Sequence, residues 1–101
     1  MESRTLDNLI LENEDYIFAG NLTIEGDCIL KKSKLIVSGT ITFLSPYADV
    51  IIDEGSEIAA ETITSNVVCF IKDSYLYCKN LLSSCNEAPW IAYNSNIVVI
   101  N

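Results

Sequence analysis

The most reactive nucleophiles and soft metal ligands that this chain could offer are its four cysteines, Cys28, Cys69, Cys78 and Cys85. The chain has no histidine, and a cysteine nucleophile normally relies on one as its base. No two of the cysteines form the C-x-x-C pair that is usual in zinc sites. We therefore interpret all four as free thiols that act as small apolar side chains, and we expect neither a metal nor a cofactor.

Carboxylates are the other candidate catalytic groups, and they dominate the charge of the chain. Asp and Glu number 14 against 6 Lys and Arg, so the formal net charge is −8. A carboxyl that works as a general acid or base usually has a pKa raised by burial. These acids instead lie in polar breaks such as "ENED" and "DEGSE", where we expect them to be solvated. Since the chain also lacks a phosphate-binding loop, the sequence predicts that the protein is not an enzyme.

The negative charge also restricts the partners. It repels the phosphates of nucleic acids and anionic membrane surfaces, whereas it suits a basic protein partner. Between residues 44 and 66 the chain carries five acids and no base. We predict that these acids and a neighbouring tyrosine bind the partner: Asp49, Asp53, Glu54, Glu57, Glu61 and Tyr47. The alternative interpretation is that the acids form only a solvated face.

A repeat of short apolar segments must position these groups. Thr-Ile-Thr occurs at residues 40–42 and again at residues 62–64. Around these copies the chain shows three short β-branched segments per unit, separated by polar or glycine-containing breaks, and successive units start roughly 19 to 22 residues apart. Three short strands per turn of about 20 residues are typical of a parallel β-helix.

We predict an all-β protein with a short parallel β-helix (β-solenoid) of about five irregular rungs and three short strands per rung. Residues 1–101 would form a single domain. Residues 1–8 would be an N-terminal cap, in a short helix over Leu9 and Ile10, and residues 9–101 would form rungs with loop insertions near 44–48 and 83–89. Ile41 and Ile63 would stack inside the column. The alternative is an antiparallel β-sandwich, although no Asn-Gly or Asp-Gly hairpin turn occurs.

The stacking also predicts which charges lie on neighbouring rungs. Lys31 would lie beside Glu54, Glu54 beside Lys72, and Lys34 beside Glu57. Opposite charges on neighbouring strands stabilise a sheet by roughly 0.2–1 kcal/mol per pair. Part of the charge pattern therefore has a structural explanation.

The last expected rung is apolar, with no charged residue after Glu87. Unpaired strand edges invite pairing, and exposed apolar patches mark interfaces. We predict that this rung joins two copies in a twofold dimer, through Ile97, Val98, Val99, Ile100 and Trp90. The alternative is that the segment from Ser83 to Trp90 closes the end of the column from within.

The apolar I-x-G-x-I-x-I rhythm between Gly20 and Leu82 resembles that of the bactofilins, bacterial scaffold proteins with a β-helical core. This resemblance implies a structural protein that assembles end to end. The small size and acidity are also similar to those of phage-encoded antagonists of bacterial defence, including anti-CRISPR proteins. We take as first hypothesis an acidic inhibitor or decoy that covers a basic, nucleic-acid-binding surface of another protein. Because the chain shows neither a secretory signal nor a membrane-spanning run, we expect a cytoplasmic protein.

Overall fold

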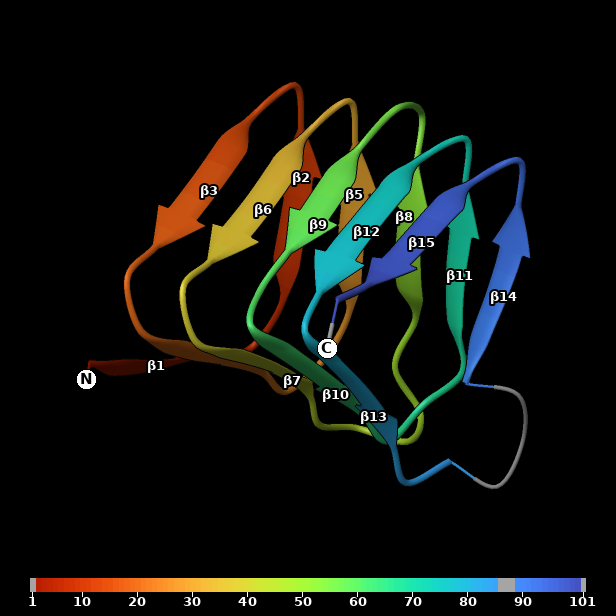
Figure 1. Cartoon of the computed structure of the whole chain (residues 1–101). Helices are drawn as coiled ribbons and strands as arrows, with labels where there is room; N and C mark the ends of the chain where they lie inside the picture. Colours follow the sequence, from red (N-terminus) through yellow and green to blue (C-terminus); the bar gives the residue numbers. More distant parts are fainter. Residues whose placement is uncertain (1, 86–88, 101) are drawn as a thin grey trace.

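A computed structural model of the protein describes residues 2–85 and 89–100. It contains fifteen strands in three parallel five-stranded sheets, which stack as a β-solenoid of five rungs (Figure 1). In the part of the chain that the structure describes, every strand pair is parallel. The predicted short parallel β-helix is therefore confirmed, and the antiparallel sandwich is excluded.

Each rung contributes one strand to each sheet, in the chain order A, B, C. Sheet A contains β1 (Ser3–Leu6), β4 (Asn21–Ile24), β7 (Thr40–Phe43), β10 (Thr62–Ser65) and β13 (Asn80–Ser83). Sheet B contains β2 (Leu9–Glu12), β5 (Cys28–Lys31), β8 (Val50–Asp53), β11 (Cys69–Lys72) and β14 (Trp90–Tyr93). Sheet C contains β3 (Asp15–Phe18), β6 (Lys34–Val37), β9 (Glu57–Ala59), β12 (Tyr75–Cys78) and β15 (Asn96–Val99).

The N-terminal segment differs from our expectation. Residues 3–6 form strand β1, which pairs with β4, and not a short helix over Leu9 and Ile10. The pairing gives the outer edge of β4 a partner for its backbone groups, which would otherwise be left as an open edge. Leu6 packs against the core from the end of this strand. Residues 3–6 are thus the first side of rung 1.

The core is a set of columns of apolar side chains, one residue per rung. Ile41 and Ile63 are register partners, and both are fully buried, as the repeat predicted. Leu22 precedes them and Leu81 follows them in the same column. Inward and outward positions alternate along each strand because successive side chains of a strand point to opposite faces.

The corner between sheets B and C begins with the same backbone conformation on all five rungs. One residue per rung has a positive φ: Asn13, Lys32, Glu54, Asp73 and Asn94. Non-glycine residues adopt this left-handed conformation rarely, so its recurrence at one place indicates that the stack imposes it. On rung 3 the turn is one residue longer, and Gly55 also has a positive φ of 77°.

A ladder of serines lines the inside of the same corner. Ser33, Ser56 and Ser74 are buried. The Ser33 N–H donates to Ser56 Oγ at 3.1 Å, and the Ser56 N–H donates to Ser74 Oγ at 3.1 Å. Each hydroxyl in turn donates to a carbonyl of its own rung, as Ser33 Oγ does to Lys31 O at 2.7 Å. The serines therefore satisfy buried polar groups where the chain changes direction, and they hold neighbouring rungs in phase.

Candidate functional site

Three of the cysteines belong to the core. Cys28, Cys69 and Cys78 are buried. Burial raises the pKa of the Cys69 thiol from its usual 9.0 to about 11, although a hydrogen bond with Ser65 opposes this shift. Burial likewise raises the pKa of Cys28 and of Cys78. These thiols are protonated at neutral pH and pack as small apolar groups.

The predicted partner-binding acids all lie on rung 3, but they do not share one face. Asp53, Glu54 and Glu57 lie at the corner between sheets B and C, whereas Asp49 lies at the A–B corner and Glu61 at the C–A corner. Residues that are close in sequence run round the perimeter of a solenoid rung, so a cluster in the sequence is spread over its corners. Tyr47, in the loop between β7 and β8, is 93% exposed.

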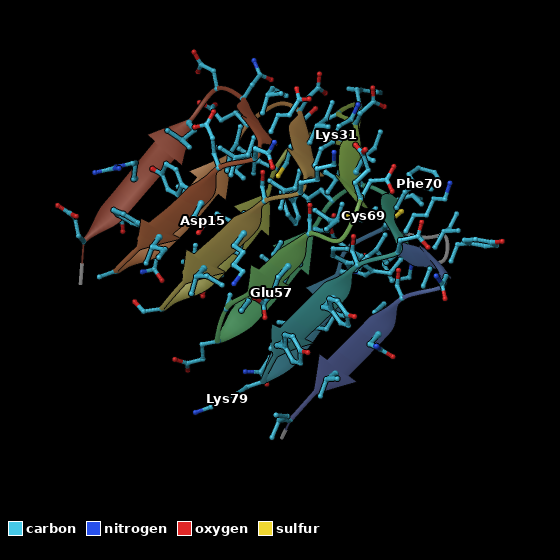
Figure 2. All side chains as sticks on the ribbon, turned by 90° about the horizontal axis from the view of Figure 1, so that it is seen from above. Asp15, Lys31, Glu57, Cys69, Phe70 and Lys79 are labelled. Carbon is cyan, nitrogen blue, oxygen red and sulfur yellow. The ribbon has the colours of Figure 1, made fainter. Side chains whose placement is uncertain are left out.

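Charges at the B–C corner are compensated along the stack. Lys34 is the register partner of both Asp15 and Glu57, as we predicted for Glu57, and Figure 2 shows Asp15 and Glu57 on the same outer side. Lys31 pairs with Asp53, and our expectation that Glu54 is its neighbour was wrong. Glu54 instead takes the corner position that Lys32 has on rung 2, and the extra residue of the rung 3 turn, Gly55, follows it. This corner therefore presents alternating charges.

The A–B corner is different, because its acids have no compensating base. Asp7, Glu25 and Asp27 join Asp49 there, on rungs 1 to 3, and no Lys or Arg occurs among the described residues of this corner. The Asp27 N–H donates to Asn8 Oδ1 at 2.7 Å, and the Asp49 N–H donates to Asp27 Oδ1 at 2.8 Å. These hydrogen bonds tie Asp27 to rung 1 and Asp49 to rung 2, and consecutive rungs lie about 4.8 Å apart. We call Asp7, Glu25, Asp27 and Asp49 the acidic corner.

Sequence reasoning found Asp49 but missed the other three acids of this corner. They lie far from Asp49 in the sequence, and only the phase of each residue within the repeat could have placed them together. Gly26 shows how tight the corner is, because a Cβ on it would lie 2.6 Å from the Asp7 carbonyl oxygen. Its backbone N–H also donates to that oxygen.

An apolar ladder runs along the outer face of sheet B, beside the acidic corner. It consists of register partners from all five rungs: Ile10, Ile29, Ile51, Phe70 and Ile91. Phe70 is 47% exposed, and Figure 2 shows it outside the column, whereas its neighbour Cys69 points inward. A groove of about 520 Å³ lies next to Phe70, with Pro46, Ala48 and Val68 among its lining residues.

Sheet C carries a second groove on its outer face, and this one is mostly apolar. It has a volume of about 410 Å³, and its lining includes Ile36, Ala59 and Tyr77. Glu61 and Lys79 lie at its edge, so the groove has one charge of each sign. This balance distinguishes it from the groove beside the acidic corner.

The two ends of the column differ. On rung 1, Arg4 occupies the position that Leu22 has on rung 2. Its guanidinium lies 4.6 Å from the Phe18 ring centroid and donates to the Tyr16 hydroxyl at 2.8 Å. On rung 5, Val99 and Ile100 are 42% and 62% exposed. Arg4 therefore covers one end with a polar group, whereas apolar side chains line the other.

The residues predicted for self-association have different surroundings. Val98, Val99 and Ile100 are exposed, and Ile97 and Trp90 are half-buried against the core. The Trp90 ring packs edge-on to Phe43, with ring centroids 6.4 Å apart. Part of the loop that precedes Trp90, residues 86–88, falls outside the described residues. Whether that loop closes the end of the column stays a prediction.

Comparisons with protein-family models, curated proteins and solved structures found no match to this chain. Within the described residues, no group of His, Cys, Asp and Glu side chains is arranged to hold a metal ion. No helix in the described ranges has the length and apolar character needed to cross a membrane.

Proposed function

We propose that the protein is a non-catalytic binding module whose acidic corner and outer sheet B face hold a basic protein partner. The observation that carries the proposal is that the described residues of the A–B corner include four acids and no Lys or Arg. At the B–C corner, by contrast, acids and bases alternate along the stack. Carboxylates held on consecutive rungs suit a row of Lys or Arg side chains, which recognise carboxylates and phosphates alike. The partner's nucleic-acid-binding surface is the target that this chemistry fits best, and covering it makes the protein an inhibitor or decoy.

The apolar ladder of sheet B supports the same proposal. Charges at the rim of an interface mainly steer association, whereas buried aromatic and aliphatic anchors supply most of its free energy. Ile51 follows Asp49 by two residues and is the register partner of Phe70, so apolar anchors begin within two residues of a steering charge. A partner segment with a basic residue next to an apolar one would engage both.

The experiment compares two variants with equal net charge. In one, Asp7, Glu25 and Asp49 of the acidic corner become Lys. In the control, Glu12, Glu14 and Asp15 of the B–C corner become Lys. Each reversal adds two charges, so both variants change the net charge of −8 to −2. Circular dichroism checks that both remain folded.

We expect the unaltered protein and the control to capture the same basic protein from a host lysate, and the acidic-corner variant to lose it. Capture should also weaken as salt screens the charges. Mass spectrometry identifies the captured protein, and its affinity is then measured with purified components. Equal capture by both variants, or a captured protein that is not basic, would contradict the proposal.

A second candidate function is self-association through rung 5, as in a structural module. It is favoured by the exposed apolar side chains of that rung and by the outer edges of β13, β14 and β15, on which no described strand stacks. Because Arg4 covers the opposite end, this geometry fits a closed twofold dimer better than an end-to-end filament. Light scattering tests it with Val99→Lys. A monomer of 11.2 kDa that Val99→Lys leaves unchanged would exclude it.

A further inference from the structure

The outer face of sheet A differs in chemistry from the faces of sheets B and C. Its outward positions carry mostly hydroxyl and amide groups, and among the described residues none of them is charged or aromatic. Six are threonines: Thr5, Thr23, Thr40, Thr42, Thr62 and Thr64. In a chain with 14 acids and a net charge of −8, a whole side of the solenoid is thus free of charge. We call this side the threonine face.

The threonine face is regular in two directions. Thr5, Thr23, Thr42 and Thr64 are register partners on four consecutive rungs, and Thr40 and Thr62 are partners in the neighbouring column. Rungs lie about 4.8 Å apart, and alternate residues of a strand lie about 6.6 Å apart. The face therefore repeats hydroxyl and methyl groups on a rectangular grid.

This grid is held in place before any ligand arrives. Threonine is stiff about χ1 because it is branched at Cβ, and the four threonines of rungs 3 and 4 are half-buried by their neighbours. Asn80 Nδ2 donates to Thr62 Oγ1 at 3.2 Å, and the Thr40 N–H donates to Asn21 Oδ1 at 2.9 Å. Rigid groups lose little conformational entropy on binding.

A rigid grid that repeats in two directions is complementary to a ligand that repeats in the same directions, which is a crystal surface. An ionic mineral would be matched by carboxylates, and this face has none. A crystalline polysaccharide would be matched by aromatic rings, and none points outward from the described strands of sheet A. The prism surface of ice is uncharged, and its oxygen rows have spacings close to those of the grid. We propose that the threonine face binds ice.

The test uses the full-length protein, and its probe is ice itself. A dilute solution is frozen slowly onto a cooled surface, and the protein in the ice is compared with the protein left in the liquid. Recrystallisation of fine-grained ice is followed in parallel. Thr42→Lys places a charge in the middle of the threonine face. The matched control is Ala59→Lys, which changes an outward, half-buried position of the same rung on sheet C.

We expect the unaltered protein and Ala59→Lys to enter the ice and slow its recrystallisation, and Thr42→Lys to lose both effects. Should circular dichroism show that Thr42→Lys is unfolded, Thr42→Tyr replaces it, since tyrosine is a good strand former whose bulk interrupts the grid. Exclusion of the unaltered protein from ice, or entry of the folded Thr42 variants at the same level, would overturn the proposal. Neither result bears on the acidic corner, because neither Thr42 nor Ala59 belongs to it.

Discussion

Rungs 4 and 5 follow the same sequence pattern but have different surroundings. Ile63 on β10 and Leu81 on β13 are register partners that both point inward, yet Ile63 is fully buried and Leu81 is only partly buried. In a solenoid each rung contacts only its neighbours, so a rung with a neighbour on one side buries less. Burial is therefore a property of the stack, and stability should decrease towards rung 5.

The largest expected effect comes from the inward column. Ile63→Ala should lower the free energy of unfolding by about 2–5 kcal/mol, because it removes buried methyl groups and leaves a cavity between rungs. Leu81→Ala should cost clearly less, since that side chain is partly exposed. Urea unfolding of both variants measures the difference. Equal losses of stability, or a loss below about 1 kcal/mol for Ile63→Ala, would contradict the conclusion that rung 4 buries its inward side chain more fully than rung 5.

The serine ladder provides a second comparison between inner and outer rungs. Ser56→Ala leaves the buried Ser33 N–H without its acceptor, which should cost about 1–3 kcal/mol. Ser95→Ala removes the acceptor of the Ser74 N–H. Because Ser95 is half-exposed, a water molecule can accept this hydrogen bond in place of the lost hydroxyl. Thermal unfolding should rank Ser56→Ala as the more destabilising variant. A larger loss of stability for Ser95→Ala would contradict the prediction, because the cost would then not follow the burial of the serine.

The buried thiol of rung 4 predicts a loss of stability at alkaline pH. The pKa of Cys69 is 9.0 in its usual surroundings and about 11 in the fold. The unfolded chain therefore releases this proton first as the pH rises. Stability from Cys69 is complete below pH 9 and is lost as the pH rises to about 11, by up to about 1.4 kcal/mol per pH unit. Cys69→Val should flatten this decrease in unfolding experiments from pH 8 to 11.

The smallest expected effect is a difference in labelling rate between two buried cysteines. Cys28 lies on rung 2, and Cys69 on rung 4 is covered by rung 5, where Trp90 is its register partner. If rung 5 opens locally, Cys69 should react with iodoacetamide faster than Cys28 in the native protein. Mass spectrometry of labelled peptides measures both rates. Identical rates would show that both thiols are reached only by global unfolding.

Much of the fold could be predicted from the sequence, because the same signal recurs on every rung. The phase of Thr-Ile-Thr correctly placed Ile41 and Ile63 together, and the pairing of Lys34 with Glu57 followed from the same alignment. The predicted N-terminal helix was wrong because it rested on apolar spacing in one short segment. That spacing fits a strand, a turn and a second strand equally well.

The candidate surfaces were harder to predict than the fold. Single insertions change which residues become neighbours. Gly55 on rung 3 adds one residue between sheets B and C, so Lys31 pairs with Asp53, 22 residues on, whereas Lys34 pairs with Glu57, 23 residues on. The acidic corner combines residues from three rungs, and the grouping of acids near residue 50 concealed it. The sequence showed the amount of charge but not its distribution round the perimeter.

The sequence by itself determined which side chains point into the column, because strand alternation and a repeat of about 20 residues are local and recurrent signals. Only the tertiary structure decided which outward side chains meet. The lengths of the turns set the phase of each rung against the next, and stacking then joins residues about 20 positions apart into ladders. The acidic corner, the apolar ladder and the threonine face exist only in the stack, because each takes one or two side chains from any single rung.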